Sequence, residues 1–357
     1  MHTAASIETN SSQKKHPHIL VLRFSAMGDV AMIVPVLSVL RQTYPEIKVT
    51  VASRSFFRPL FSQIPNVHFY EADINGVHSG VMGLSSLAKE LKDEEEIDMV
   101  ADLHDVLRTN ILRSIFYLYG IPFKQIDKGR AEKKALTRSD NKVFQQLKST
   151  HQRYADVFKN LGYPIDLNNY RPPKKRKLLP KIYDIVGKQS QKWLGIAPFA
   201  QHNSKVYPAD LMEEVIAEIN KTGHYKILLF GGGEKEKLQL AHWEKEFQHC
   251  VSLVGKLSLA EELTVISNLD GMLSMDSGNA HFAAIYEIPV ITLWGVTHPF
   301  TGFSAFGQPM QNSILPDLHQ YPKIPTSVYG NKVPAGYEDV MRSIPPEKVI
   351  RKILELI

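Results

Sequence analysis

The sequence predicts an α/β protein made of two doubly wound domains, each built on a mainly parallel sheet. Strand-like runs alternate with helix-like segments between residues 18 and 161, and the alternation restarts after residue 192. A polar, proline-bearing stretch, PIDLNNYRPPKKRKLLP (164–180), separates the two series. The length of 357 residues also suits about two domains. Because a helix between two strands returns over the sheet and leaves the strands parallel, the alternation indicates βαβ units.

Short apolar, β-branched runs are the expected strands of the first series. They are HILVLRF (18–24), KVTVA (48–52), VHFY (67–70), DMVADL (98–103) and PFKQI (122–126). The segments with helical spacing lie between or after them, at 29–43, 83–93, 105–119 and 140–161.

The second series repeats the pattern. Its expected strands are WLGIAP (193–198), YKILLFGGG (225–233), CVSLVG (250–255), DGMLSM (270–275) and PVITLWG (289–295). The expected helices are 208–221, 234–247, 259–268 and 278–286, followed by a last helix at 345–357 that begins with prolines, which the first turn of a helix tolerates.

These elements define the expected organisation of the chain. We expect a disordered tail at 1–17, a Rossmann-like domain at 18–170, a linker at 171–190, a second Rossmann-like domain at 191–335 and a C-terminal segment with a helix at 336–357. Ligands of open parallel sheets bind at the carboxyl ends of the strands, so two facing domains predict one central cleft.

Composition excludes several classes of protein. The single cysteine, Cys250, rules out an intramolecular disulfide and a thiolate zinc site and suits a reducing compartment. No apolar run approaches the ~20 residues that span a bilayer, and the first residues lack the apolar core of a signal peptide. The net charge of +5 permits anionic substrates, but KKRK (174–177) is the longest basic run and no nucleic-acid-binding signature is present.

The stretch RFSAMGDVAMIVPVL (23–37) follows the first expected strand. It lacks the G-x-G-x-x-G pattern of dinucleotide-binding turns and offers one glycine, Gly28, followed at once by Asp29. A carboxylate at this edge of the sheet could accept the proton of an attacking hydroxyl group. The alternative is that Asp29 caps the helix expected to start near Val30, a role compatible with the first.

An anion site is predicted at SMDSGNAHFAA (274–284). Asp276 and Ser277 are suitable N-cap residues, and Gly278 permits a close approach of the backbone to a ligand. Free N–H groups at the start of the helix attract anions, and His281 could add a hydrogen bond to a phosphate. The alternative is a capped helix with a packed histidine.

Two further loops follow strands of the second series. In IAPFAQHNSKVYPADL (196–211), Lys205 precedes a helix and could contact phosphate oxygens, or it is a surface lysine. FGGGEKE (230–236) could surround a nucleobase or ribose, or it is a flexible turn.

Cations at strand ends of the first domain suggest an anionic acceptor, although each one could equally lie on a solvated helix face. They are Arg54, Arg58, Arg108, Arg113, Arg130 and Lys133. No Asp-x-Asp occurs in the sequence, so a sugar-nucleotide site that chelates a metal through that motif is not expected.

Together these motifs resemble glycosyltransferase family 9, the ADP-heptose:lipopolysaccharide heptosyltransferases. The resemblance lies in SAMGDV (25–30), the A-x₇-K-x-Y-P pattern (197–208), and MDSGNAHFAA (275–284) followed by PVITLWGVTHP (289–299). The AQHNS loop before Lys205 departs from the family, in which threonines are familiar near the phosphates.

The resemblance implies a GT-B fold with the acceptor in the first domain and the donor in the second. It implies inverting transfer without a metal or another cofactor, with Asp29 as the general base. The donor would contact the family-matched residues and their neighbours, namely Met27, Gly28, Ala200, Gln201, Lys205, Gly232, Glu234, Leu257, Asp276, Ser277, Gly278, Asn279 and His281.

The expected partners are a nucleotide-sugar donor and an anionic, lipid-linked glycan acceptor, without nucleic acid. The expected location is cytoplasmic, with peripheral contact at the inner membrane. Three alternatives remain open at this stage: a GT-B protein that binds a sugar nucleotide without transferring it, a family member with a different nucleotide sugar, and a GT-B epimerase. A nicotinamide-dependent oxidoreductase is disfavoured by the missing glycine fingerprint.

Overall fold

The computed structural model describes residues 16–188 and 190–357, so most of the expected N-terminal tail lies outside the described residues. The first domain contains a five-stranded parallel sheet in the order β3-β2-β1-β4-β5. Its strands are β1 (His18–Leu22), β2 (Lys48–Ser53), β3 (Val67–Glu71), β4 (Met99–Asp102) and β5 (Phe123–Gln125). Its helices are α1 (Met27–Ala31), α2 (Ile33–Thr43), α3 (Arg58–Phe61), α4 (Gly80–Asp93), α5 (Leu107–Leu118), α6 (Arg130–Leu136) and α7 (Thr150–Asn160).

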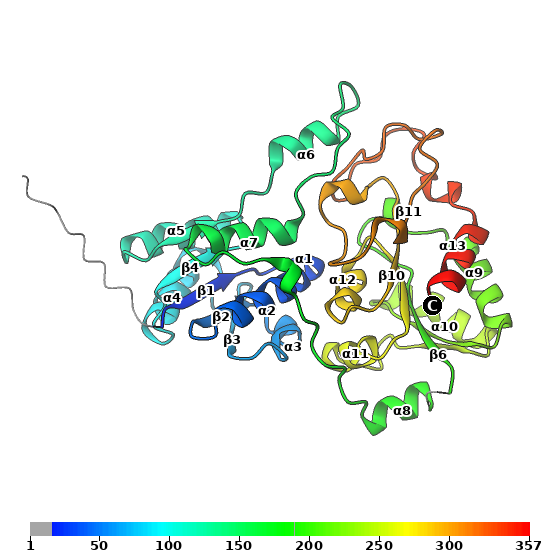
Figure 1. The fold of residues 1–357 in the computed structure, drawn as a ribbon, viewed down its shortest axis with the longest axis horizontal. Helices are drawn as coiled ribbons and strands as arrows, with labels where there is room; N and C mark the ends of the chain where they lie inside the picture. The colour runs from blue at the N-terminus through cyan, green and yellow to red at the C-terminus, as the bar shows by residue number, and fades with distance from the viewer. Residues whose placement is uncertain (1–15, 189) are drawn as a thin grey trace, which may run out of the picture.

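The second domain contains a six-stranded parallel sheet in the order β11-β10-β9-β6-β7-β8. Its strands are β6 (Lys192–Ala197), β7 (Tyr225–Leu229), β8 (Cys250–Ser252), β9 (Gly271–Met275), β10 (Val290–Leu293) and β11 (Ser313–Ile314). Its helices are α9 (Ala209–Lys221), α10 (Glu234–Glu246), α11 (Leu259–Ile266), α12 (Gly278–Ile285) and α13 (Pro346–Leu356). The doubly wound, two-domain fold predicted from the sequence is confirmed, and Figure 1 shows the two domains side by side with α1 and α12 between them.

Both sheets are covered on both faces, as parallel sheets require. Every residue of β1 is buried, and so is every residue of β9 and β10. One continuous apolar cluster contains Val30 and Ile33 of the first domain together with Phe282 and Ile285 of the second. The two domains are therefore joined by a shared core next to the cleft.

The helix predicted at 29–43 differs from the observed one. The chain forms α1 and α2, separated at Met32. The cause is Pro35, which has no N–H to donate to the carbonyl of Ala31 four residues earlier, so the ladder breaks where α1 ends.

The helix predicted at 140–161 starts only at Thr150, where the Ser149 hydroxyl accepts a hydrogen bond from the N–H of Gln152 at 3.1 Å. The segment before it is extended along the second domain. There the N–H of Leu147 donates to the carbonyl of Phe300 at 3.0 Å.

The expected linker, 171–190, contains a helix that the sequence interpretation missed, α8 (Pro180–Val186). Its Ile182 and Val186 are buried in the shared apolar cluster. The last helix, α13, packs its Val349 and Ile353 into the core of the second domain.

Candidate functional site

A cleft of about 620 Å³ lies between the domains, at the carboxyl ends of both sheets. Its walls come from the start of α1 in the first domain and from the loops after β6, β7, β8 and β9 in the second. The residues of the expected site that line it are Met27, Gly28, Asp29, Ala200, Gln201, Lys205, Gly232, Asp276, Ser277, Gly278, Asn279 and His281. The loops that the sequence pattern singled out therefore meet around one cavity.

Asp29 lies in the first turn of α1 and is 23% exposed to the cleft. Its Oδ2 is 2.7 Å from a guanidinium nitrogen of the buried Arg23 and 3.4 Å from the N–H of Ala26. Its backbone carbonyl accepts a hydrogen bond from the hydroxyl of Tyr154 at 3.2 Å. Within the described part of the chain Oδ1 has no partner, so one carboxylate oxygen is held and the other is available to a ligand.

The N-terminus of α12 lies against the start of α1 and lines the cleft from the second domain. Ser277 occupies the N-cap position, but its side chain does not cap the helix and lies 3.2 Å from the hydroxyl of Ser274 instead. The first N–H groups of α12 therefore face the cleft without a side-chain acceptor, which favours an anion there.

Asp276 does not cap α12 as the sequence suggested. Its Oδ2 accepts hydrogen bonds from Lys205 at 3.1 Å and from the Thr297 hydroxyl at 2.9 Å. Lys205 and Asp276 are only 13% and 10% exposed, so their ion pair is well shielded from water. The lysine is thus fixed beside the helix N-terminus, where a diphosphate would need a cation.

His281 lies one turn into α12 against the first domain. It is buried, its Nδ1 has no hydrogen-bond partner in the described chain, and a Cβ on Gly28 would come within 3.0 Å of its ring. Burial lowers its pKa, the Lys205 charge lowers it further, and Asp276 and Asp29 oppose this shift. The ring is therefore neutral around pH 7 and can act as a donor or acceptor rather than as a cation.

The glycine-rich loop after β7 places a different glutamate at the cleft from the one expected. Glu236, rather than Glu234, lines the cavity, and its carboxylate accepts a hydrogen bond from the N–H of Gly232 at 2.7 Å. Glu236 is the third residue of α10, the position from which a glutamate reaches back to the preceding loop. That spacing in GGGEKE was the signal that could have found it.

The start of α11, which follows the loop after β8, adds residues that the sequence interpretation missed. Leu259 and Glu262 line the cleft, whereas the expected Leu257 packs against the shared core and is not among the lining residues. Phe56 of the first domain faces the same cavity.

A smaller chamber of about 140 Å³ adjoins the cleft and shares Asp29 and Tyr329 with it. Its walls are cationic and come from Arg23, Lys128, Lys133 and Arg153, together with His104. Burial, with Arg23, Lys128 and Arg108 nearby, lowers the pKa of His104 to about 3, so this ring is neutral.

Lys133 is the expected acceptor-binding residue that lines this chamber. It is buried, and its Nζ lies 4.4 Å from the ring centroid of Phe303. No described residue forms a hydrogen bond or ion pair with its ammonium group. Burial and the nearby Arg153 lower its pKa to about 8, against the attraction of Asp29.

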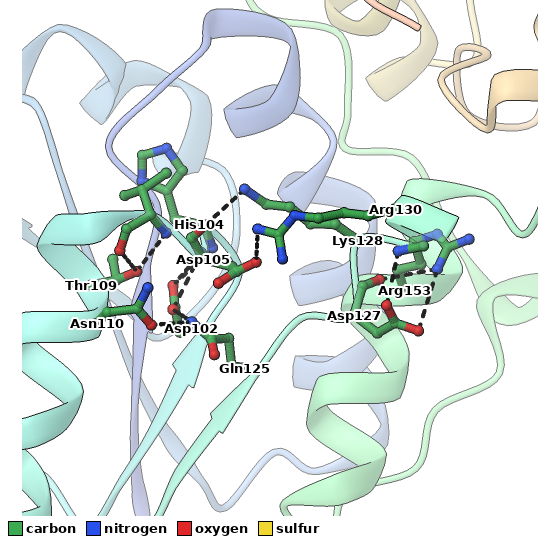
Figure 2. A network of polar contacts seen from close by, with 12 residues as sticks. Asp102, His104, Asp105, Thr109, Asn110, Gln125, Asp127, Lys128, Arg130 and Arg153 are labelled. Atoms are coloured by element: carbon green, nitrogen blue, oxygen red, sulfur yellow. Dashed lines mark hydrogen bonds and ion pairs between the residues drawn. The ribbon is translucent and has the colours of Figure 1, made fainter. Parts of the chain in front are cut away.

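Hydrogen bonds and ion pairs hold the chamber walls in place (Figure 2). Asp102, at the end of β4, accepts hydrogen bonds from the N–H of His104 at 2.9 Å and from the Gln125 amide at 3.0 Å. Lys128 donates to the carbonyl of Asp105 at 2.9 Å, and Arg153 donates to the carbonyl of Asp127 at 3.0 Å.

The other expected acceptor-binding cations line neither cavity. Arg58 lies 3.5 Å from Glu71, Arg113 donates to Gln125 at 3.0 Å, and Arg130 pairs with Asp105. Arg54 and Arg108 likewise lie outside the residues that surround the two cavities. Contact of these five arginines with an acceptor remains a prediction.

The described residues contain neither a cluster suited to a metal ion nor a membrane-spanning helix. In residues 16–188 and 190–357 no group of three or more His, Cys, Asp or Glu side chains is arranged to hold a metal ion. No helix in the same ranges is long and apolar enough to cross a membrane.

Comparison with known proteins assigns the family. The family model described as glycosyltransferase family 9 (heptosyltransferase) matches residues 84–329, more than half of the chain. The chain belongs to glycosyltransferase family 9. It is therefore a glycosyltransferase, and the cleft between its two domains is the candidate active site.

Individual relatives agree with this assignment. Lipooligosaccharide heptosyltransferase 2 of Haemophilus influenzae is 24% identical over 365 residues, which cover 95% of this chain and 99% of that relative. A solved family 9 glycosyl transferase from Veillonella parvula has a TM-score of 0.74 at 19% identity, covering 97% of this chain and 99% of its own. Escherichia coli heptosyltransferase WaaC, solved with ADP, has a TM-score of 0.66 at 17% identity, covering 95% and 100%. The family 9 member thus has the GT-B fold.

Proposed function

We propose that this family 9 enzyme transfers a heptose from ADP-heptose to an anionic sugar of a lipopolysaccharide core, with inversion at the anomeric carbon and without a metal ion. The observation that carries the proposal is the placement of Asp29 and the uncapped N-terminus of α12 next to each other in one cleft, one from each domain. The names of the relatives, heptosyltransferases of lipopolysaccharide and lipooligosaccharide, support the choice of sugar and acceptor.

The donor diphosphate would bind at α12 and Lys205. The free N–H groups of Ser277 and Gly278 and the ammonium group of Lys205 face the same part of the cleft. These groups would stabilise the negative charge that grows on the diphosphate as its bond to the sugar breaks. The chain itself would therefore supply the positive charge that a metal ion supplies in other glycosyltransferases.

The acceptor hydroxyl would be activated by Asp29. As that oxygen forms its bond to the anomeric carbon, Oδ1 of Asp29 accepts the proton and the bond from that carbon to the diphosphate breaks. Arg23 holds the other oxygen, Oδ2, and so fixes the direction of the carboxylate. A single displacement from the face opposite the leaving diphosphate inverts the anomeric configuration.

The acceptor anion would occupy the cationic chamber next to Asp29. Lys133 lies there without an acidic partner in the described chain, and Lys128 and Arg153 are held beside it. A phosphate or carboxylate in that chamber would bring the neighbouring hydroxyl groups of the acceptor toward Asp29. Since a lipopolysaccharide acceptor is anchored in lipid, we place the enzyme at the cytoplasmic surface of the membrane.

The test is transfer from ADP-heptose to a lipopolysaccharide core acceptor in the presence of EDTA. We expect transfer at the rate measured without EDTA, release of ADP, and a glycosidic linkage whose anomeric configuration is opposite to that of the donor, as read by NMR. Loss of activity in EDTA would overturn metal independence, and retention of configuration would overturn the single displacement. Faster transfer from a UDP- or GDP-sugar would show that ADP-heptose is not the preferred donor. Tight binding of ADP-heptose without transfer would favour a binding protein.

A further inference from the structure

The loops after β9, β6, β7 and β8 line the cleft from the second domain, and they are arranged in the same order as these strands in the sheet. In the sheet, β9 is followed by β6, β7 and β8, so the loop containing Asp276 lies at one end of the row and the loop before α11 at the other. Neighbouring strands are about 4.8 Å apart, so three steps across the sheet span roughly 14 Å. A ligand with its phosphates at α12 would therefore reach the loop after β8 with its far end.

That far end of the cleft is mostly apolar and contains one carboxyl group. Gly255 and Leu259 line it from the second domain, and Phe56 of the first domain, which is 53% exposed, lines the same cavity. Glu262, in the first turn of α11, contributes the carboxyl group. Apolar walls with a small number of polar groups are typical of sites that bind a ligand in one orientation.

The carboxyl group of Glu262 has no hydrogen-bond or ion-pair partner among the described residues. Its neighbour Glu261 accepts hydrogen bonds from Lys181 at 2.8 Å and from the N–H of Ser258 at 2.7 Å. No described residue donates a hydrogen bond to the side chain of Glu262, although the residue is only partly exposed. Burial raises the pKa of Glu262 to about 7, with no cation nearby to oppose the shift. A half-buried carboxyl group without a partner is costly unless a ligand satisfies it.

We propose that Glu262 determines nucleobase specificity by accepting a hydrogen bond from the exocyclic amino group of the base, so that the enzyme selects adenine over bases with an oxo group at that position. This inference rests on the proposed function, because it assumes a nucleotide in the cleft. A 6-oxo group would place an acceptor against a carboxylate oxygen, which is repulsive. The selection belongs to the ionised carboxylate, because a protonated carboxyl group could donate to a 6-oxo group.

The test compares ADP with inosine diphosphate, which carries a 6-oxo group in place of the 6-amino group. Both would be titrated calorimetrically into the wild-type protein, Glu262→Ala and Glu262→Gln, with Glu261→Gln as the control from the same turn of α11. Hydrogen bonds to charged groups discriminate by roughly tenfold or more, so we expect the wild type to prefer ADP by about that factor. Glu262→Ala should bring the two dissociation constants within about twofold, mainly by weakening ADP. Because an amide can also donate, Glu262→Gln should bind inosine diphosphate better than the wild type does.

Melting temperatures separate specificity from a merely structural role for Glu262. A change in the ADP preference with an unchanged melting temperature supports the inference. An unchanged preference in both Glu262 variants, in a protein that binds ADP, overturns the nucleobase role and leaves the proposed function intact. A wild-type protein that binds neither nucleotide overturns both.

Discussion

A guanidinium nitrogen of Arg23 lies 2.7 Å from Oδ2 of Asp29 at the carboxyl end of the first sheet. The same arginine donates to the carbonyl of Leu103 at 2.6 Å, so it is anchored to the chain that follows β4. The carboxylate is thereby fixed in direction while its other oxygen stays open to the cleft. The Arg23–Asp29 ion pair therefore positions the proposed base and also ties α1 to the chain after β4.

Replacement of Asp29 by Asn should lower turnover by roughly 10²–10⁴-fold, the usual range for loss of a general base. ADP affinity should change little, because the donor phosphates would bind to the α12 N-terminus and Lys205 rather than to Asp29. Initial rates with ADP-heptose and a lipopolysaccharide core acceptor, together with calorimetry of ADP, measure both quantities. Glu71→Gln, which removes an ion pair with Arg58 outside the cleft, is the matched control. Wild-type turnover in Asp29→Asn would remove the base assignment.

Replacement of Lys205 by Met should weaken ADP binding about tenfold or more, because the cation beside the α12 N-terminus is lost. The same change leaves the carboxylate of Asp276 shielded from water, with the Thr297 hydroxyl as its one remaining side-chain partner among the described residues, so the melting temperature should also fall. The double variant Lys205→Met, Asp276→Asn separates the two effects. It should regain stability without regaining ADP affinity. Recovery of affinity in the double variant would show that Lys205 acts through Asp276 rather than on the phosphates.

Acceptor binding should weaken as the pH rises through about 8, the pKa to which burial lowers Lys133. Above that pH the ammonium group loses its proton and its attraction for an anion, so the KM for the acceptor should approach a tenfold rise per pH unit. Lys133→Arg should keep acceptor binding to higher pH, because arginine stays protonated. Lys134→Met, on the exposed side of the same helix, should follow the wild-type profile. A wild-type KM that is flat between pH 7 and 9 (the range around the pKa of Lys133) would remove Lys133 from the acceptor site.

The contribution of Lys133 to the free energy of unfolding should increase with pH, whereas its contribution to acceptor binding decreases. Its pKa in the folded protein lies below its ordinary value, so the unfolded state binds more protons between about pH 8 and pH 10. The free energy of unfolding contributed by this group therefore increases as the pH rises through that window, and its penalty is largest below pH 8. Denaturant unfolding of the wild type and of Lys133→Met over that window measures the difference.

The sequence predicted the fold well because the strand and helix periodicities are local properties. The alternation of HILVL, KVTVA and their counterparts with helical segments was enough to indicate both sheets. The failures have tertiary causes. Residues 140–149 form no helix because Leu147 bonds to the carbonyl of Phe300 in the second domain, and α8 forms in the linker because Ile182 and Val186 are buried in the shared core.

The candidate site divides in the same way. Asp29, Lys205 and the α12 start were found because each follows a strand, and the carboxyl ends of parallel strands converge. The environment of Glu262 depends on how α11 faces the first domain, which no local pattern encodes. The expected arginines were chosen by their charge and their position at strand ends, and neither reveals that Arg130 and Arg58 pair with Asp105 and Glu71.

The close approach of the two domains should depend on Gly28 more than on Gly278. A Cβ on Gly28 would lie 3.0 Å from a ring carbon of the buried His281, and that ring has little room to move. A Cβ on Gly278 would lie 2.8 Å from the terminal methyl group of Met27, which can rotate away. Gly28→Ala should therefore lower the free energy of unfolding by roughly 1–3 kcal/mol, as overpacking does. Gly278→Ala should be near neutral, since alanine is the better helix former. Denaturant unfolding of the two variants side by side checks the difference, and equal stabilities would show that α1 and α12 separate freely at this contact.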